Sequence, residues 1–212
     1  MDWNAWKGAM RGRDCLVFGD GPSTHDLASR QWFGGFWRIA CNRAVRVIDP
    51  DFAVCVEPPR RDRELWREIL DAGAVATFTK QDMAAKWWPG VVLIENGLAR
   101  SQQRVIDDFR TWVGPEPRQF GGEHLKAQMS PAWAVGVAAH LGFETVGLVG
   151  VDLTGDRWGD LSRWEERWAE LVKLCAAAGT RVIQCSAASN LKAVPFVPNP
   201  FDEIRRRRCP RD

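Results

Sequence analysis

The sequence contains no tyrosine and only three histidines, whereas tryptophan occurs 12 times in 212 residues. The absence of tyrosine removes phenol hydroxyls from the possible catalytic acids. No two cysteines have the CxxC spacing of zinc ribbons or thioredoxin-like redox sites, so both classes are excluded. We expect buried free thiols at the four cysteines in or beside apolar runs. These are Cys15, Cys41, Cys55 and Cys185.

Long apolar segments and a large charge of one sign are also absent. No run approaches the roughly 18 apolar residues that span a bilayer, and the N-terminal stretch has no apolar core of the signal-peptide type. These patterns predict no membrane partner and a cytoplasmic location. Lys and Arg number 29 against 27 Asp and Glu, a formal net charge of +2, which by itself indicates no nucleic-acid partner.

Apolar runs alternate with helical patterns along the chain. Strands are predicted at 15–19, 37–41, 52–57, 74–80, 91–96, 144–152 and 180–186. Helices are predicted at 3–10, 24–30, 61–73, 101–113, 129–142 and 161–179, with a long loop after residue 113. The alternation predicts an α/β fold, Rossmann-like, with a mostly parallel sheet and helices on both faces. We expect a single domain over 1–204 and a basic flexible tail over 205–212.

A glycine-rich turn follows the first predicted strand and precedes a helix. It reads Gly19, Asp20, Gly21, Pro22 and Ser23. Backbone N–H groups at such a turn can hold a phosphate, glycine lets the backbone approach it, and Ser23 can donate its hydroxyl. The alternative is a tight strand–helix turn, and the missing GxGxxG fingerprint disfavours NAD. Asp20 would repel a phosphate, so either a divalent cation bridges them or Asp20 holds a ribose or base group.

Other polar residues follow predicted strands or begin a helix. After the second strand, Asn42 can bind a base or ribose edge and Arg43 can pair with phosphate. Asp152 follows a buried strand, where a carboxylate can bind a metal or a substrate hydroxyl, and Glu57 ends another strand. Ser130 begins a helix whose N-terminus can form a second phosphate clamp. Each residue also has a structural alternative. Asn42 could begin a turn, Asp152 could begin a turn, and Ser130 could be an ordinary N-cap.

The remaining candidates are histidines and the basic tail. His140 lies among apolar helix residues and is predicted to be structural, whereas His124 lies in the long loop and is a possible general base. No nucleophile elbow is present. The run Arg205–Arg208 is either a solvated charge run or a nucleic-acid contact.

Four motifs in this order resemble a known superfamily. They are GDGPS at 19–23, CNRA at 41–44, SPAWAVGVAAHLGFETVGLVGVDL at 130–153 and CSAASNLKAVPFVPNPFDEI at 185–204. The superfamily joins the bacterial sialyltransferases of glycosyltransferase family 42 with the archaeal 6-hydroxymethylpterin diphosphokinase-like proteins, the old domain of unknown function 115. The chain resembles especially the short, stand-alone members common in phage and prophage genomes. The resemblance covers residues 13–204.

This resemblance implies a Rossmann-like nucleotide-binding fold. In the sialyltransferases the corresponding positions hold the cytidine nucleotide of the donor, and here they are Gly19 to Ser23, Asn42 and Ser130. Those enzymes also use a late histidine and tyrosine hydroxyls, whereas this chain has no tyrosine and no histidine after His140. The diphosphokinase relatives use Mg²⁺ and acidic residues to transfer diphosphate from ATP.

The leading interpretation is a transferase that binds a nucleotide-activated donor, foremost a nucleotide-sugar glycosyltransferase. The 19–23 turn and the start of the 129–142 helix would bind the phosphate. Asn42 and Arg43 would bind the nucleoside. Asp152, Glu57 or His124 would deprotonate the acceptor hydroxyl. The segment 154–161 would border the acceptor or act as a lid.

Two alternative functions stay open. One is a Mg²⁺-dependent diphosphotransferase, in which Asp20 and Asp152 would bind the metal. The other is a non-catalytic phage accessory protein that binds nucleotide, or nucleic acid through Arg205–Arg208.

Overall fold

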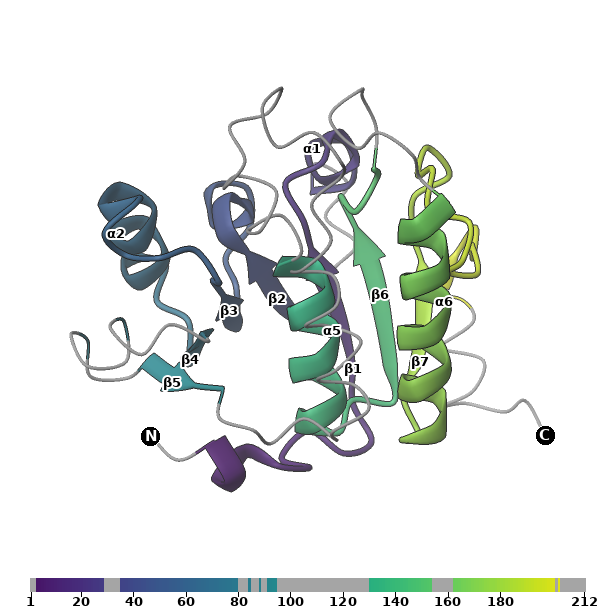
Figure 1. The fold of residues 1–212 in the computed structure, drawn as a ribbon, viewed down its shortest axis with the longest axis horizontal. Helices are drawn as coiled ribbons and strands as arrows, with labels where there is room; N and C mark the ends of the chain where they lie inside the picture. The colour runs from purple at the N-terminus through teal and green to yellow at the C-terminus, as the bar shows by residue number, and fades with distance from the viewer. Residues whose placement is uncertain are drawn as a thin grey trace.

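Seven strands form one parallel sheet in the computed structural model, which describes residues 3–28, 35–79, 84, 88, 91–94, 130–153, 162–200 and 202. The strands are β1 (Asp14–Phe18), β2 (Trp37–Cys41), β3 (Phe52–Val54), β4 (Ala76–Thr79), β5 (Val91–Leu93), β6 (Thr145–Val149) and β7 (Arg181–Gln184). Their order is β5-β4-β3-β2-β1-β6-β7, and every pairing is parallel. The predicted α/β, Rossmann-like fold is confirmed (Figure 1).

Four α-helices and two 3-10 helices are described with the sheet. They are η1 (Trp3–Trp6), α1 (Pro22–Ala28), η2 (Asn42–Arg46), α2 (Arg63–Asp71), α5 (Ser130–Leu141) and α6 (Ser162–Ala177). The helix expected at 3–10 is only the short η1. The predicted helix 101–113, the 154–161 segment and the 205–212 tail lie outside the described residues.

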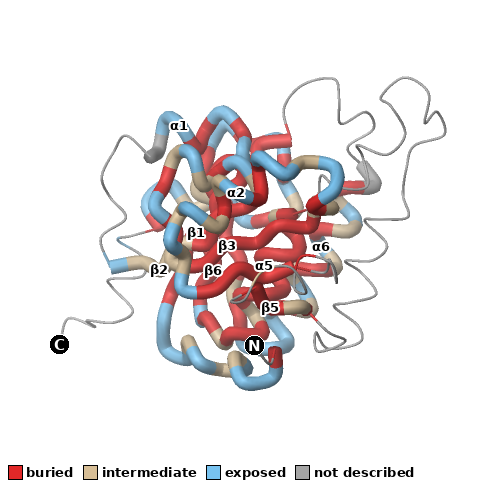
Figure 2. Tube along the Cα trace, turned by 90° about the vertical axis from the view of Figure 1, so that its left-hand side faces the viewer, coloured by how far each residue is buried: buried red, intermediate tan, exposed pale blue. Residues whose placement is uncertain are grey.

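Alternate side chains of each strand enter cores on opposite faces of the sheet. In β1, Cys15 and Val17 join the core that contains α5 and α6, whereas Leu16 and Phe18 join a core beside η2. A third cluster lies between α2 and the β3–β5 side of the sheet. Figure 2 shows the buried residues gathered along the strands and α5. Helices therefore cover both faces, which explains why the strands read as continuous apolar runs.

Three tryptophans and His140 lie in the core. Trp3, Trp66 and Trp168 are fully buried, so at these positions tryptophan is a core anchor rather than a base-stacking platform. The Trp3 ring stacks on His140 with centroids 3.8 Å apart, and His140 Nε2 lies 3.1 Å from the Trp3 carbonyl oxygen. The structural role predicted for His140 is confirmed.

Three of the four cysteines match the prediction of buried free thiols, whereas Cys185 is a half-buried free thiol. Cys15, Cys41, Cys55 and Cys185 are free thiols, and the first three are buried. Burial raises the pKa of the Cys185 thiol to about 12, and it raises the pKa of the others as well. A raised pKa keeps a thiol protonated at neutral pH, so these four cysteines are poor nucleophiles.

Candidate functional site

The strand order reverses direction at β1. The chain leaves β1 for β2 on one side of the sheet and later returns to β6 on the other side. In open parallel sheets, ligands bind beyond the carboxyl ends of the strands at such a switch point. Two turns meet there, one after β1 from Gly19 to Ser23 and one after β6 from Gly150 to Leu153. The sequence-predicted glycine turn and Asp152 are thus brought together.

Backbone hydrogen bonds join the two turns. The Gly19 N–H donates to the Val149 carbonyl oxygen at 2.8 Å, and the Gly21 N–H donates to the Gly150 carbonyl oxygen at 2.9 Å. A Cβ on Gly21 would lie 2.5 Å from that Gly150 oxygen and 2.7 Å from Asp152 Oδ2. The glycine is needed for contact between the turns, whereas the sequence suggested that it makes room for a phosphate.

Ser23 and Asp152 extend this contact through side chains. Ser23 donates its backbone N–H to Asp152 Oδ2 at 2.8 Å and its hydroxyl to Asp152 Oδ1 at 2.6 Å. The Ser23 hydroxyl oxygen in turn accepts from the Gly150 N–H at 3.0 Å. Both residues are buried, with Asp152 only 3% exposed. The Ser23 hydroxyl expected to face a phosphate is therefore directed at a carboxylate.

Few N–H groups of the glycine turn remain for a ligand. Those of Gly19, Gly21 and Ser23 donate to the β6 side, and that of Thr24 donates to the Gly21 carbonyl oxygen at 3.0 Å. Proline has no N–H. Within the described part of the chain, Asp20 is the turn residue whose N–H has no acceptor. Phosphate binding by this turn would rest on that one donor.

Asp20 and Asn42 follow the carboxyl ends of β1 and β2, two neighbouring strands of the sheet. Phe18 pairs with Ala40 in the parallel register, and each of the two polar residues follows two positions later. Asn42 begins η2 with a φ of 50°, a left-handed conformation that asparagine tolerates better than most residues. Its side-chain oxygen Oδ1 is buried, and none of the described residues donates to it. A buried acceptor without a donor is costly, so this oxygen needs a donor from outside the described residues, such as a water, a ligand or another part of the chain.

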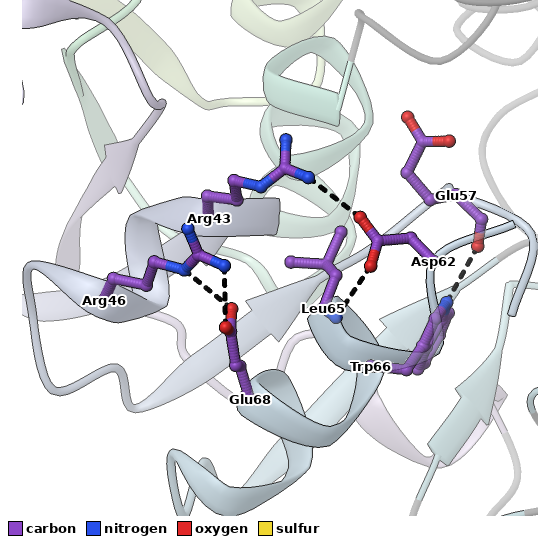
Figure 3. Close-up of polar contacts among 7 residues, drawn as sticks. All are labelled: Arg43, Arg46, Glu57, Asp62, Leu65, Trp66 and Glu68. Carbon is purple, nitrogen blue, oxygen red and sulfur yellow. Dashed lines mark hydrogen bonds and ion pairs between the residues drawn. The ribbon is translucent and has the colours of Figure 1, made fainter.

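Arg43 is directed away from this point. Its guanidinium Nη2 lies 2.8 Å from Asp62 Oδ2, while Asp62 Oδ1 accepts from the Leu65 N–H at 2.9 Å and so caps α2 (Figure 3). Glu57 lies beyond the end of β3, which is shorter than the predicted 52–57 strand. Its carbonyl oxygen accepts from Trp66 Nε1 at 3.0 Å, and its carboxylate points away from Trp66.

A bidentate ion pair joins η2 to α2 close to Arg43 and Asp62. Arg46 donates Nε and Nη2 to the two carboxylate oxygens of Glu68, at 2.8 and 2.6 Å. These hydrogen bonds hold the pKa of the Glu68 carboxyl below its ordinary value of 4.5. Since Asn42 is the first residue of η2, the pair steadies the helix that carries it.

We expect Glu68→Gln to reduce stability in a pH-dependent way. Because the pKa of Glu68 is lowered in the folded state, its contribution is complete above about 4.5 and is lost as the pH falls through the lower folded value. Urea unfolding of both proteins between pH 3 and 7 at low salt measures this. The difference should vanish at the acid end and shrink in 1 M salt. A difference independent of pH would contradict the assignment.

Ser130 occupies the first position of α5 and is 1% exposed. The helix leads directly into β6, so its C-terminus lies at the amino edge of the sheet and its N-terminus at the carboxyl edge (Figure 1). It packs on β1 and β2. Ser130 is therefore at the same edge as Asp20 and Asn42. His124 lies outside the described residues.

Part of the 185–204 motif, to which the sequence analysis gave no role in the site, holds the end of β6. We name residues 186–193 the strap. The Ser189 hydroxyl donates to the Val151 carbonyl oxygen at 2.9 Å, and Gln184 Nε2 donates to the same oxygen at 3.3 Å. Asn190 donates its backbone N–H to the Asp152 carbonyl oxygen at 2.8 Å. The polar cluster in CSAASN was the one signal for it in the sequence.

Two further contacts fix the strap. Asn190 Nδ2 donates to the Leu153 carbonyl oxygen at 3.3 Å, where Leu153 has a φ of 49°. On the other side, the backbone N–H groups of Lys192 and Ala193 donate to the carboxylate of Glu165 in α6, the former at 2.6 Å. The strap therefore links α6 to the turn that presents Asp152.

Metal and membrane features are absent from the part of the chain that the structure describes. There, no three His, Cys, Asp or Glu side chains gather as a metal site. The carboxylate of Asp152 is bound by Ser23, whereas that of Asp20 is exposed beyond β1. Among the same residues, no helix has the length and apolar character to cross a bilayer.

Comparison with known proteins gives a fold relative. No protein-family model matches the chain. No curated protein matches it either. Among solved structures it is similar to the sialyltransferase CstII from Campylobacter jejuni, in complex with a substrate analogue, cytidine-5′-monophosphate. The TM-score is 0.57 at 12% identity, over 89% of this chain and 86% of the other. The sialyltransferase-like fold implied by the motifs is thus supported.

Proposed function

We propose that this chain is a transferase that takes a nucleotide-activated sugar as donor, with a cytidine nucleotide as its activating group. The observation that carries the proposal is the buried Asn42 Oδ1 at the carboxyl edge of the sheet, to which no described residue donates. The fold relative, a sialyltransferase in complex with cytidine-5′-monophosphate, supports the choice of nucleotide.

The donor lies across the carboxyl ends of β1 and β2 in this proposal. Asn42 binds the nucleoside, and the N-terminus of α5 with Ser130 binds the phosphate. That helix N-terminus attracts negative charge, which grows on the phosphate oxygen as its bond to the sugar breaks. Of the glycine turn, the exposed Asp20 faces the donor, while Gly21 and Ser23 keep the turn in place through the β6 contacts.

The acceptor hydroxyl needs a general base in this reaction. The base takes the hydroxyl proton as the acceptor oxygen attacks the anomeric carbon of the sugar. Asp152 is poorly suited, because both of its oxygens accept from Ser23 and it is 3% exposed. We therefore propose Glu57 or His124 as the base and give Asp152 the task of positioning the turn. Arg43, which pairs with Asp62, orders the edge of the site.

A thermal-shift panel tests the proposal. CMP, UMP, GMP, ADP and ATP are each added with and without Mg²⁺, to the wild type and to Asn42→Ala. A ligand at about 100 times its dissociation constant adds roughly 2.7 kcal/mol of stability. We expect CMP to stabilise the wild type without metal, and the shift to be lost in Asn42→Ala. If no nucleotide raised the melting temperature, the proposed function would be wrong.

The panel also tests the narrower interpretations. A response to ATP only with Mg²⁺ would favour the diphosphokinase-like alternative, with Asp20 and Asp152 near the metal. No response to nucleotides, combined with salt-sensitive DNA binding lost on removal of 205–212, would favour the non-catalytic accessory protein. Membership of the phage-type group stays a prediction from the motifs.

A further inference from the structure

Leu153 has a backbone conformation that leucine rarely adopts. Its φ is 49°, and this left-handed region disfavours such a residue by about tenfold in population. Among the described residues, the other positive φ angles belong to seven glycines and to Asn42. Asn42 and Leu153 both follow strands at the carboxyl edge of the sheet, β2 and β6. Residues held in sparsely populated conformations cluster at functional sites, so the cause of this one was sought in its contacts.

Asn190 holds both peptide groups that flank Leu153. Its backbone N–H donates to the Asp152 carbonyl oxygen at 2.8 Å, and its Nδ2 donates to the Leu153 carbonyl oxygen at 3.3 Å. The angles φ and ψ of a residue set the orientation of its two flanking peptides, so one residue that binds both carbonyl groups fixes the conformation between them. Burial of the Leu153 side chain, 5% exposed, explains why a leucine stands here but not why its φ is positive.

Asn190 is itself held by the strap on both sides. Before it, the Ser189 hydroxyl donates to the Val151 carbonyl oxygen at 2.9 Å. After it, the backbone N–H of Lys192 donates to the Glu165 carboxylate at 2.6 Å. Asn190 is exposed, so replacing its side chain opens no cavity in the core. Its effect on Leu153 can therefore be tested separately from the packing of the protein.

The conformation of Leu153 bears on the turn that presents Asp152. Rotation about φ of Leu153 tilts the peptide that joins it to Asp152. The Asp152 carboxylate accepts from the N–H and the hydroxyl of Ser23, at 2.8 and 2.6 Å. Ser23 belongs to the glycine turn that follows β1. A continuous series of contacts therefore runs from the strap to the glycine turn.

We propose that Asn190 is a positioning residue of the donor site, which holds Leu153 in the left-handed conformation and so keeps Asp152 and the glycine turn in the arrangement that binds nucleotide. The inference rests on the proposed function and goes beyond it, because it gives a role to a strap residue that acts through others. Without the Asn190 side chain, Leu153 takes a negative φ in most molecules. The apparent affinity for nucleotide then falls with the fraction that stays competent to bind.

The test measures CMP dissociation constants by calorimetry for the wild type, Asn190→Ala, Leu153→Gly and the double variant, with urea unfolding of each protein alongside. The control is Asn199→Ala, which also removes an exposed asparagine, one whose Nδ2 donates to Asp202 Oδ2 at 2.6 Å. We expect Asn190→Ala to weaken CMP binding by about five- to tenfold and Asn199→Ala to leave it unchanged.

The Leu153→Gly background separates positioning from general support of the fold. Glycine takes positive and negative φ about equally readily, so roughly half of the molecules stay competent without Asn190. The loss caused by Asn190→Ala should therefore shrink to about twofold in this background. If Leu153→Gly does not fold, Leu153→Asn gives the same comparison, because asparagine is enriched at positive φ.

The outcomes distinguish the inference from the proposed function. Unchanged CMP binding in Asn190→Ala would overturn the inference alone. An equal loss of CMP binding with leucine and with glycine at position 153 would also overturn it, because the strap would then act only through the stability of the fold. A wild type that binds no nucleotide would overturn the proposed function and the inference with it.

Discussion

Gly150→Ala is expected to lower the free energy of unfolding by about 3 kcal/mol or more. Gly150 has a φ of +69°, and an added Cβ would overlap Thr24 Oγ1 and lie 2.9 Å from the Gly19 carbonyl oxygen. The left-handed conformation costs a non-glycine residue about 1–2 kcal/mol. Forcing a methyl group into a filled site adds about 1–3 kcal/mol. For a chain of this size, the melting temperature should fall by roughly 6–12 °C.

Gly73→Ala is the matched control for this change. Gly73 has nearly the same φ, +71°, but nothing lies within 4 Å of its added Cβ. It should therefore show only the conformational cost, about 1–2 kcal/mol. Urea and thermal unfolding of both variants separate the steric contribution from the backbone contribution. Equal losses in the two variants would show that the β1 and β6 turns are not in the close contact described above.

Asp152→Ala is expected to destabilise the fold by about 2–3 kcal/mol. It leaves the Ser23 N–H and hydroxyl, which are buried, without the carboxylate that accepts from both. Hydrogen bonds to charged groups contribute about 1.5–3 kcal/mol each, and buried donors left unsatisfied add to the loss. Because the same contacts hold the glycine turn, the variant should also bind CMP more weakly than the wild type.

A double-mutant cycle with Ser23→Ala identifies the pair as the origin of this effect. If the two side chains act together, the double variant should be more stable than the sum of the single losses predicts, by about 1–3 kcal/mol. Asp49→Ala serves as the control, because it removes an exposed carboxylate at the opposite edge of the sheet. Additive losses for Ser23→Ala and Asp152→Ala would show that the two residues stabilise the protein independently.

The fold could be predicted from the sequence because its central strands are covered on both faces. Runs such as 15–19 and 37–41 read as buried strands, and β1 and β2 lie where they were expected. The predicted positions of the strand ends were less accurate than the predicted strands themselves. The run 144–152 continues to be apolar beyond Val149, but β6 ends there because Gly150 takes a positive φ and turns the chain. Apolar patterning reports burial and does not report where strand pairing stops.

The candidate site was predicted in its members but not in its contacts. Gly21, Ser23 and Asp152 were each selected for standing at a strand end, and the structure does bring them together. Their use for one another, rather than for a phosphate, depends on residues 129 positions apart. The sequence of a local motif is the same whether its N–H and O–H groups donate to a ligand or to a strand far away in the chain. The buried oxygen of Asn42, to which none of the described residues donates, can likewise be identified only from the structure.

The strap has a consequence for the order in which the chain can mature during synthesis. Translation delivers residues from the N-terminus at about 5–20 per second, and a contact forms only when both partners exist. The glycine turn and Asp152 can meet once β6 has been made. However, among the described residues the carbonyl oxygen of Val151 accepts from Gln184 and Ser189, and those of Asp152 and Leu153 accept from Asn190. The last strand, β7, ends at Gln184, just before the strap. The sheet and the donors to the end of β6 are therefore completed almost together, and we expect the carboxyl edge of the sheet to become rigid only after the strap has been synthesised.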